Sequence, residues 1–206
     1  VERTAASVAM GWEPLVTIAV DGLVHLAPVF CSLQEFSLEH PTTRVTLLET
    51  ILSGTDEALL LRKADLAITA RVPPGFLGSH SHDIRVIPVA CADHELARQN
   101  HAISEVELAQ HRQIVIKDSG EKRQQDAGWL QAEQRWTVSH FSSSIEAIKA
   151  GLGFGFVPEA LITNEIKSGE LKHLPLASGG ERFISTYLVL TGQSSAGPAT
   201  KAVAES

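Results

Sequence analysis

The chain has 206 residues, of which 44% are hydrophobic and 20% are charged, and it carries a net charge of −7. These proportions are ordinary for folded domains and exclude a disordered or fibrous chain, and the length suffices for one large domain or two small lobes. Because the acidic charge is spread over both halves, we do not expect this segment to grip DNA phosphates itself.

The apolar runs and the cysteines indicate a cytoplasmic protein without membrane contact. The longest apolar run, around Leu59–Leu61, is far shorter than the ~18 to 20 residues of a membrane span, and no signal-peptide pattern opens the sequence. The chain begins at Val1 without a strand pattern, so we expect a segment of a longer protein. Cys31 and Cys91 lack any metal-ligand spacing and are predicted to be reduced thiols.

The first third of the chain alternates strands with helices. A β-branched run at 15–20 predicts a strand, and apolar residues at helical spacing follow over 26–36. A second strand is predicted at 45–49 and a third at 65–70, with Thr55 as the N-cap of the helix between them. Such alternation is typical of a parallel sheet.

After a loop rich in Pro, Gly and His, the alternation begins again and predicts a second α/β lobe. We predict strands at 84–91, 114–116, 136–140 and 183–190. We predict helices at the capping boxes Ser104–Glu107 and Ser143–Glu146, at 127–133, from Pro158 to about Lys167 and from about Pro198. The last strand and helix are expected to return to the first lobe, which makes two chain crossings.

Three segments carry a resemblance to a known family. Residues 62–68, 92–97 and 147–158 resemble the effector-binding domain of LysR-type transcriptional regulators, and the last segment, AIKAGLGFGFVP, is the most specific. The similarity spans nearly the whole chain. It implies an α/β fold of two Rossmann-like lobes joined by a two-strand hinge, like a type 2 periplasmic binding protein. The expected parts are the end of a linker helix at 1–13, lobe I at 14–89 with 182–206, and lobe II at 90–181.

The resemblance also implies a function and partners. A small-molecule effector is expected in the cleft between the lobes, with assembly as a homodimer or homotetramer through the outer face of the 26–38 helix. DNA is expected to be bound only by a winged helix-turn-helix domain outside this chain. Neither catalysis nor a cofactor is expected, and the ligand and the sense of regulation stay open.

Loops at the carboxyl ends of the predicted strands are the candidate effector-binding residues, because open α/β sheets bind ligands there. The candidates are Asp21, Gly22, Leu23, Val24, Leu52, Ala70 and Arg71 in lobe I, and Ser119, His140, Phe141, Phe156, Val157 and Pro158 in lobe II. Arg71 suits a carboxylate, and the aromatic residues suit a small organic acid or aromatic compound. The family often has Ser or Thr in its first loop, so Asp21 leaves the charge of the ligand open.

Other chemistry is less well supported by the sequence. His80, His82, His94 and His101 lack a completing set of Cys or carboxylate ligands, so no metal site is predicted. The glycines at 151, 153 and 155 end a helix rather than open one, which argues against a dinucleotide loop. No nucleophile elbow surrounds Ser142–Ser144. A free solute receptor and a hinge-bending enzyme are the alternatives, and residues 118–120 suit either a turn or an anion-binding loop.

Overall fold

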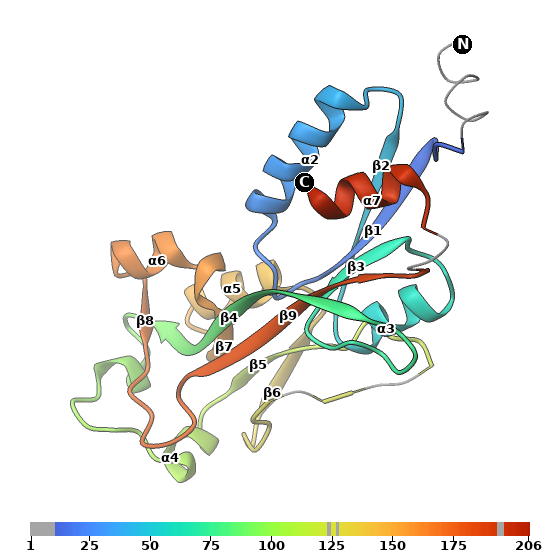
Figure 1. Ribbon diagram of the computed structural model, residues 1–206. Coiled ribbons are helices and arrows are strands. Elements are labelled where there is room, and N and C mark those ends of the chain that lie inside the picture. The colour runs from blue at the N-terminus through green and yellow to red at the C-terminus, as the bar shows by residue number, and fades with distance from the viewer. Residues whose placement is uncertain (1–10, 123–124, 127, 193–195) are drawn as a thin grey trace. The chain divides into compact units, whose positions relative to one another are not determined.

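The computed structural model describes residues 11–122, 125–126, 128–192 and 196–206, arranged in two compact units (Figure 1). Unit 1 contains the chain up to His82, with Gly120–Lys122 and Ser185–Ser206. Unit 2 contains Asp83–Ser119 and Arg123–Ile184. Residues 1–10 of the predicted linker helix lie outside the described residues. Within the described part, no helix has the length and apolarity needed to cross a membrane.

Unit 1 is built on a sheet whose strand order is β2-β1-β3-β9. Its strands are β1 (Leu15–Asp21), β2 (Arg44–Thr50), β3 (Leu66–Thr69) and β9 (Arg182–Leu190). β1 is parallel to both β2 and β3, as the alternation of strands and helices predicts, whereas β9 is antiparallel to β3. The late strand therefore returns to the first lobe, as expected.

In the described part of unit 1, three helices flank the sheet: α2 (Leu26–Glu39), α3 (Ser53–Leu60) and α7 (Pro198–Glu205). α2 and α7 lie side by side (Figure 1), and the hydroxyl of Ser32 donates to the carbonyl of Ser206 at 3.2 Å. α3 packs on the sheet through a buried cluster that includes Ala58 and Leu59. The helix from Pro198 and the 26–38 helix are thus confirmed.

The prediction of Thr55 as an N-cap is wrong, because α3 begins two residues earlier, at Ser53. The N-cap residue is Leu52, whose side chain cannot accept a hydrogen bond and whose φ is +50°. The hydroxyl of Thr55 is buried and lies 2.7 Å from that of Thr50 in β2. The sequence pattern predicts that the Thr55 hydroxyl caps the helix, but this hydroxyl instead forms a hydrogen bond with the neighbouring strand.

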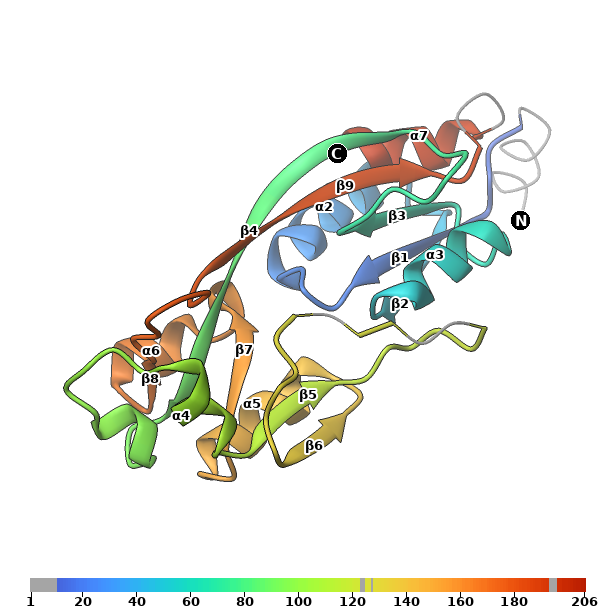
Figure 2. The same ribbon diagram turned by 90° about the horizontal axis from the view of Figure 1, so that it is seen from below.

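Two strands carry the chain between the units. β4 (Gly78–Cys91) runs from unit 1 into unit 2, and β9 returns (Figure 2). The first six residues of β4 were expected in a loop. They belong to the strand because β4 is hydrogen-bonded to β9 in the sheet, and the carbonyl of His82 also accepts from the Thr186 hydroxyl at 2.8 Å. The proposed lobe boundaries, 89/90 and 181/182, fall on or next to these strands, while the compact units divide at 82/83 and 184/185.

Unit 2 is built on parallel and antiparallel strands around β7 (Phe154–Pro158). β7 is antiparallel to β4 and parallel to β5 (Gln113–Ile116), which in turn is parallel to β6 (Arg135–Val138). β8 (Leu171–His173) pairs with β4 on its other side. The helices are α4 (Glu105–Ala109), α5 (Phe141–Lys149) and α6 (Thr163–Ser168), with 3₁₀ turns at Glu95–Arg98 and Glu159–Leu161.

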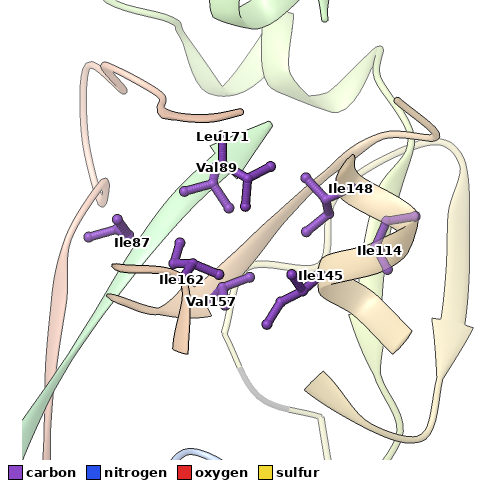
Figure 3. Close-up of a cluster of buried hydrophobic side chains, with 8 residues drawn as sticks. All are labelled: Ile87, Val89, Ile114, Ile145, Ile148, Val157, Ile162 and Leu171. Carbon is purple, nitrogen blue, oxygen red and sulfur yellow. The ribbon is translucent and has the colours of Figure 1, made fainter. Parts of the chain in front are cut away.

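The core of unit 2 explains the glycines of the AIKAGLGFGFVP segment. Figure 3 shows a buried aliphatic cluster formed by β4, β5, β7, β8, α5 and Ile162, and its members are Ile87, Val89, Ile114, Ile145, Ile148, Val157, Ile162 and Leu171. A Cβ on Gly153 would lie 2.2 Å from the carbonyl oxygen of Arg112, and Gly151 has a φ of +76° after the end of α5. Both positions require glycine for these reasons.

Three helix predictions in the second half meet different outcomes. The helix at Ser104 is confirmed with Ser104 as its N-cap, because the Ser104 side chain accepts from the N–H of Glu107, while the carboxylate of Glu107 contacts His101. Ser143 is no cap, since α5 begins earlier, at Phe141. The helix predicted from Pro158 to about Lys167 is divided, because a 3₁₀ turn precedes α6.

The helix predicted at 127–133 is wrong over 128–133, which has no helical residue, and Ala127 lies outside the described residues. Gly128 has a φ of +83°, which interrupts a right-handed helix. The side chain of Gln113 donates to the carbonyl of Trp129 at 2.7 Å, and the N–H of Glu133 donates to Ala109. These long-range hydrogen bonds replace the helical ones that the apolar spacing predicts.

The carboxylate of Glu13 caps α7. It accepts from the N–H of Ala199 at 2.9 Å and from the N–H and hydroxyl of Thr200 at 3.2 and 2.8 Å. A Cβ on Gly197 would meet this carboxylate at 2.2 Å, so glycine there permits the approach. Partial burial would raise the pKa of Glu13, but the hydrogen bonds from Thr200 and Ala199 outweigh it and hold the pKa below its usual value of 4.5.

We predict that Glu13→Ala lowers the free energy of unfolding by about 1–2 kcal/mol, because the first N–H groups of α7 lose their acceptor. Urea denaturation at neutral pH measures the loss. Since the pKa of Glu13 is lowered in the folded state, its contribution is present above pH 4.5 and disappears as the pH falls below that value. The exposed Glu35→Ala is the matched control; equal losses in both variants would contradict the capping role.

Candidate functional site

Unit 1 brings its candidate residues to one edge of the sheet. Asp21 of β1 is in register with Thr50 of β2, and Val20 is in register with Ile68 of β3. The three parallel strands therefore end together, and the loops that hold the candidates of lobe I follow at this edge. The sequence prediction that these loops are neighbours rests on this register.

The first of these loops is held by Asp21. Its carboxylate accepts from the N–H of Leu23 at 3.0 Å, its carbonyl accepts from the N–H of Val24, and the residue is buried. This arrangement is a turn stabilised by an aspartate side chain. Val24 is also buried, so its side chain contributes to the core rather than to an exposed surface.

Arg71 is paired within unit 1. Its Nη2 forms an ion pair with Oδ2 of Asp56 in the first turn of α3, and its N–H donates to the hydroxyl of Thr69. The side chain of Arg71 is 52% exposed, whereas that of Asp56 is 11% exposed. The guanidinium thus neutralises a largely buried carboxylate and keeps further N–H groups for another acceptor.

Unit 2 also aligns its candidates at one edge. Ile116 of β5 is in register with Val138 of β6, and β7 runs in the same direction. Ser119 follows β5 and is exposed, while His140 and Phe141 stand at the start of α5. The carboxylate of Asp118 accepts from the N–H of Gln125 at 2.7 Å, which organises the loop after β5.

The residues of β7 differ in their exposure. Val157 and Pro158 are buried, and Val157 belongs to the aliphatic cluster of Figure 3. Phe156 is half-buried on the opposite face, where the guanidinium of Arg182 lies 5.1 Å from its ring centroid. Of these three candidates, the Phe156 side chain is the most accessible.

The histidines have partners other than a metal. The His82 ring contacts the hydroxyls of Ser81 and Thr186, His101 contacts Glu107 at 3.1 Å, and His80 packs edge-on against Tyr187. Among the described residues, no three His, Cys, Asp or Glu side chains are grouped so that they could hold a metal ion.

His94 has a structural role. Its Nδ1 accepts from the N–H of Leu96 at 3.2 Å and caps the turn at Glu95–Arg98, which requires an unprotonated Nδ1. Burial lowers the pKa of His94 below 6.5, and the nearby His111 lowers it further, against an opposing effect of Glu95.

The comparison with protein families decides the identity of the fold. The model described as "LysR substrate binding domain" matches residues 11–206, which is nearly the whole described chain. The chain belongs to this family. The resemblance carried by residues 62–68, 92–97 and 147–158 is thereby confirmed.

Curated relatives of this LysR-family domain are named as transcriptional regulators. It is 27% identical over 175 residues to the uncharacterized HTH-type regulator YeeY of Escherichia coli (strain K12), covering 82% of this chain and 57% of that protein. It is also 27% identical over 173 residues to the probable HTH-type regulator YhaJ of the same strain, covering 82% and 58%. The chain thus spans little more than half the length of these relatives.

Solved structures establish the fold. The effector binding domain of QuiR in complex with shikimate superposes with a TM-score of 0.70 at 15% identity, covering 94% of each chain. The regulatory domain of CcmR from Synechocystis PCC6803, in complex with 2-PG, gives 0.69 at 16% identity, covering 93% and 94%. The LysR-family domain described here therefore has their two-lobed α/β fold, similar to that of periplasmic binding proteins.

Sequence reasoning missed two residues at these edges. Asp56 pairs with Arg71, whereas its place in the first turn of a helix indicates by itself only a favourable charge. Arg182 was not singled out, because nothing in its local sequence indicates that it lies over Phe156. Both contacts join residues far apart in the chain. Of the two residues, only Asp56 has a recognisable local sequence feature, which is its acidic side chain at the start of a helix.

We predict that the LysR-family domain loses stability as the pH falls below about 6.5, in part through His94. The folded state favours the neutral imidazole, so the unfolded chain binds more protons in this range and protonation favours unfolding. His94→Asn keeps a capping side chain but removes the titration, and should flatten the dependence of melting temperature on pH. His25→Gln is the control. An unchanged pH dependence in His94→Asn would refute the assignment.

Proposed function

We propose that this chain is the effector-sensing part of a LysR-type transcriptional regulator and binds a small organic molecule in the cleft between its lobes. The membership of the family over residues 11–206 is the observation that carries the proposal. In this proposal the effector binds without catalysis, and the DNA-binding helix-turn-helix belongs to another part of the full protein. A regulator of this kind acts in the cytoplasm.

The two strand edges support this site. The loops after β1, β2 and β3 and those after β5 and β6 carry polar backbone and side-chain groups, and Phe156 offers an aromatic surface. A few fixed polar groups beside apolar surface are typical of small-molecule sites. The structural relative QuiR is described in complex with shikimate, a carboxylate, which supports an organic acid as the class to test first.

Arg71 is the candidate carboxylate partner on the lobe I side. Its ion pair with Asp56 fixes the guanidinium, and the N–H groups that remain can bind an acid in a bidentate manner. Asp21, in contrast, is held by its own turn, so we do not assign it the recognition of a ligand amine. An acidic effector is therefore favoured over a basic one.

We also propose that the domain forms a homodimer, or a homotetramer built from it, through α2. Phe30 and Leu38 of this helix are 53% and 77% exposed, and Cys31 is exposed beside them. Two large apolar side chains exposed on the same helix can form the centre of a contact with another chain.

The first test is a thermal-shift screen of organic acids and their neutral amides. A ligand that binds only the folded state at a hundred times its Kd stabilises it by about 2.7 kcal/mol, which raises the melting temperature by about 5–10 °C. We expect an acid hit whose shift Arg71→Ala removes, each variant being compared with its own unliganded melting temperature.

Arg44→Ala, at the opposite end of β2, is the matched control and should retain the full shift. A screen in which no compound stabilises the domain would contradict effector binding. An acid that stabilises Arg71→Ala as well as the wild type would contradict only the assignment of Arg71.

The assembly is tested by Phe30→Glu. A carboxylate at a buried interface has no partner, so we expect the dimer to dissociate at concentrations at least about 100-fold higher than in the wild type. Sedimentation equilibrium measures the change. Val106→Glu, at a position 75% exposed on α4, is the control and should leave the assembly intact. Two variants with identical association would exclude α2 from the interface.

A further inference from the structure

Unit 2 contains an arginine that is fixed on an aromatic ring. Arg182 begins β9, and its guanidinium carbon lies 5.1 Å from the centroid of Phe156 in β7. An arginine over the face of a ring gains a cation–π attraction, while the N–H groups at its edge keep their capacity to donate. The ring therefore orients the guanidinium without satisfying its hydrogen bonds.

The backbone of Gly128 approaches the same guanidinium. A Cβ at position 128 would lie 2.8 Å from Nη1 of Arg182, and the φ of Gly128 is +83°. Any side chain at this position would thus be strained and would push the arginine from its place. The loop and the ring together hold Arg182 in one position.

The neighbouring carboxylates are committed to another arginine. Arg85 binds Glu181 through Nη2 and Glu159 through Nη1, each at 2.7 Å. The hydrogen bond from Arg85 lowers the pKa of Glu181, which keeps this carboxylate charged and paired. Glu181 precedes Arg182 directly in the chain, yet its ion pair is with Arg85.

The guanidinium of Arg182 forms no ion pair or side-chain hydrogen bond with any part of the chain that the structure describes, and the residue is half-buried. A guanidinium offers five N–H donors, so those of Arg182 are available to an acceptor from outside the described chain. Arg71 differs in this respect, since Asp56 already neutralises it.

We propose that Arg182 is an oxyanion-binding position that receives the carboxylate or phosphate group of the effector. The inference rests on the proposed function, because the anion would lie beside Phe156, one of the candidate effector residues. The paired N–H groups at the edge of the guanidinium match the two oxygens of such a group. The position would make unit 2 select an acidic effector independently of Arg71.

The test follows the side-chain Nε–H resonance of Arg182 by NMR in the isotope-labelled chain. The probes are acetate, benzoate and inorganic phosphate, with benzamide as the neutral partner of benzoate, all at constant ionic strength. We expect a saturable shift of the Arg182 resonance and of the Gly128 amide at millimolar anion, as small fragments permit, and no shift with benzamide. Arg98, an exposed arginine paired with Asp93, is the internal control.

Two variants complete the experiment. Arg182→Gln should weaken the binding of the anions about tenfold or more at the Gly128 amide, because it removes a charge-assisted hydrogen-bond donor. Arg182→Lys keeps the charge but not the paired donors, and should discriminate less between carboxylate and phosphate than the wild type does. Arg98→Gln should change neither result. The preferred probe distinguishes a carboxylate-bearing effector from a phosphorylated one.

A resonance of Arg182 that does not shift saturably, or shifts as Arg98 does, would overturn the proposal, as would unchanged anion binding in Arg182→Gln. The proposed function fails separately. If neutral compounds stabilise the domain in the thermal-shift screen while the Arg182 resonance does not shift with any anion, effector binding is supported and the oxyanion-binding role of Arg182 is refuted. If Arg182 binds anions but no organic compound stabilises the domain, anion binding by Arg182 is supported, and its assignment to an effector is contradicted together with the proposed function.

Discussion

The carboxylate of Glu13 joins the two ends of the described chain, and this contact attaches the start of α7 to the rest of unit 1. Unit 1 is assembled from an early segment and a late one, so α7 lies beside α2 although unit 2 separates them in the chain. Glu13 satisfies the first N–H groups of α7, and Gly197 leaves room for it. The helix is thereby fixed at its start by a residue that precedes β1.

A few contacts also determine where the loops with the candidate effector residues lie. Because β1, β2 and β3 are parallel and in register, three loops that are distant in sequence end side by side, and the ion pair between Asp56 and Arg71 links two of them. In unit 2, the close approach of Gly153 to Arg112 brings β7 against β5. Strand register therefore places the loops that hold the candidate residues, and contacts such as the ion pair between Asp56 and Arg71 fix the positions of individual side chains.

Much of this fold could be predicted from the sequence, since the strand and helix periods and the AIKAGLGFGFVP segment are local signals. The predictions of secondary structure are wrong where a residue forms a hydrogen bond with a distant partner instead of the local one that the pattern implies. Thr55 bonds to Thr50 rather than capping α3, and Gln113 holds Trp129 where apolar spacing indicates a helix. Likewise, pairing with β9 extends β4 back to Gly78, and the Thr186 hydroxyl donates to the carbonyl of His82. No local pattern contains the partner in these cases, so periodicity alone could not predict them.

The candidate site was predictable to the level of loops but not of charges. Parallel strands imply where the loops gather, yet whether a charged side chain is available depends on its partners in the fold. Arg71 was the obvious cation from the sequence, and Asp56 already pairs with it. Glu181 and Arg182 are adjacent in sequence, yet Glu181 pairs with Arg85, and Arg182 lies over the ring of Phe156. Which arginine is left to meet a ligand therefore depends on the folded arrangement of β4, β7 and the start of β9, which the local sequence does not contain.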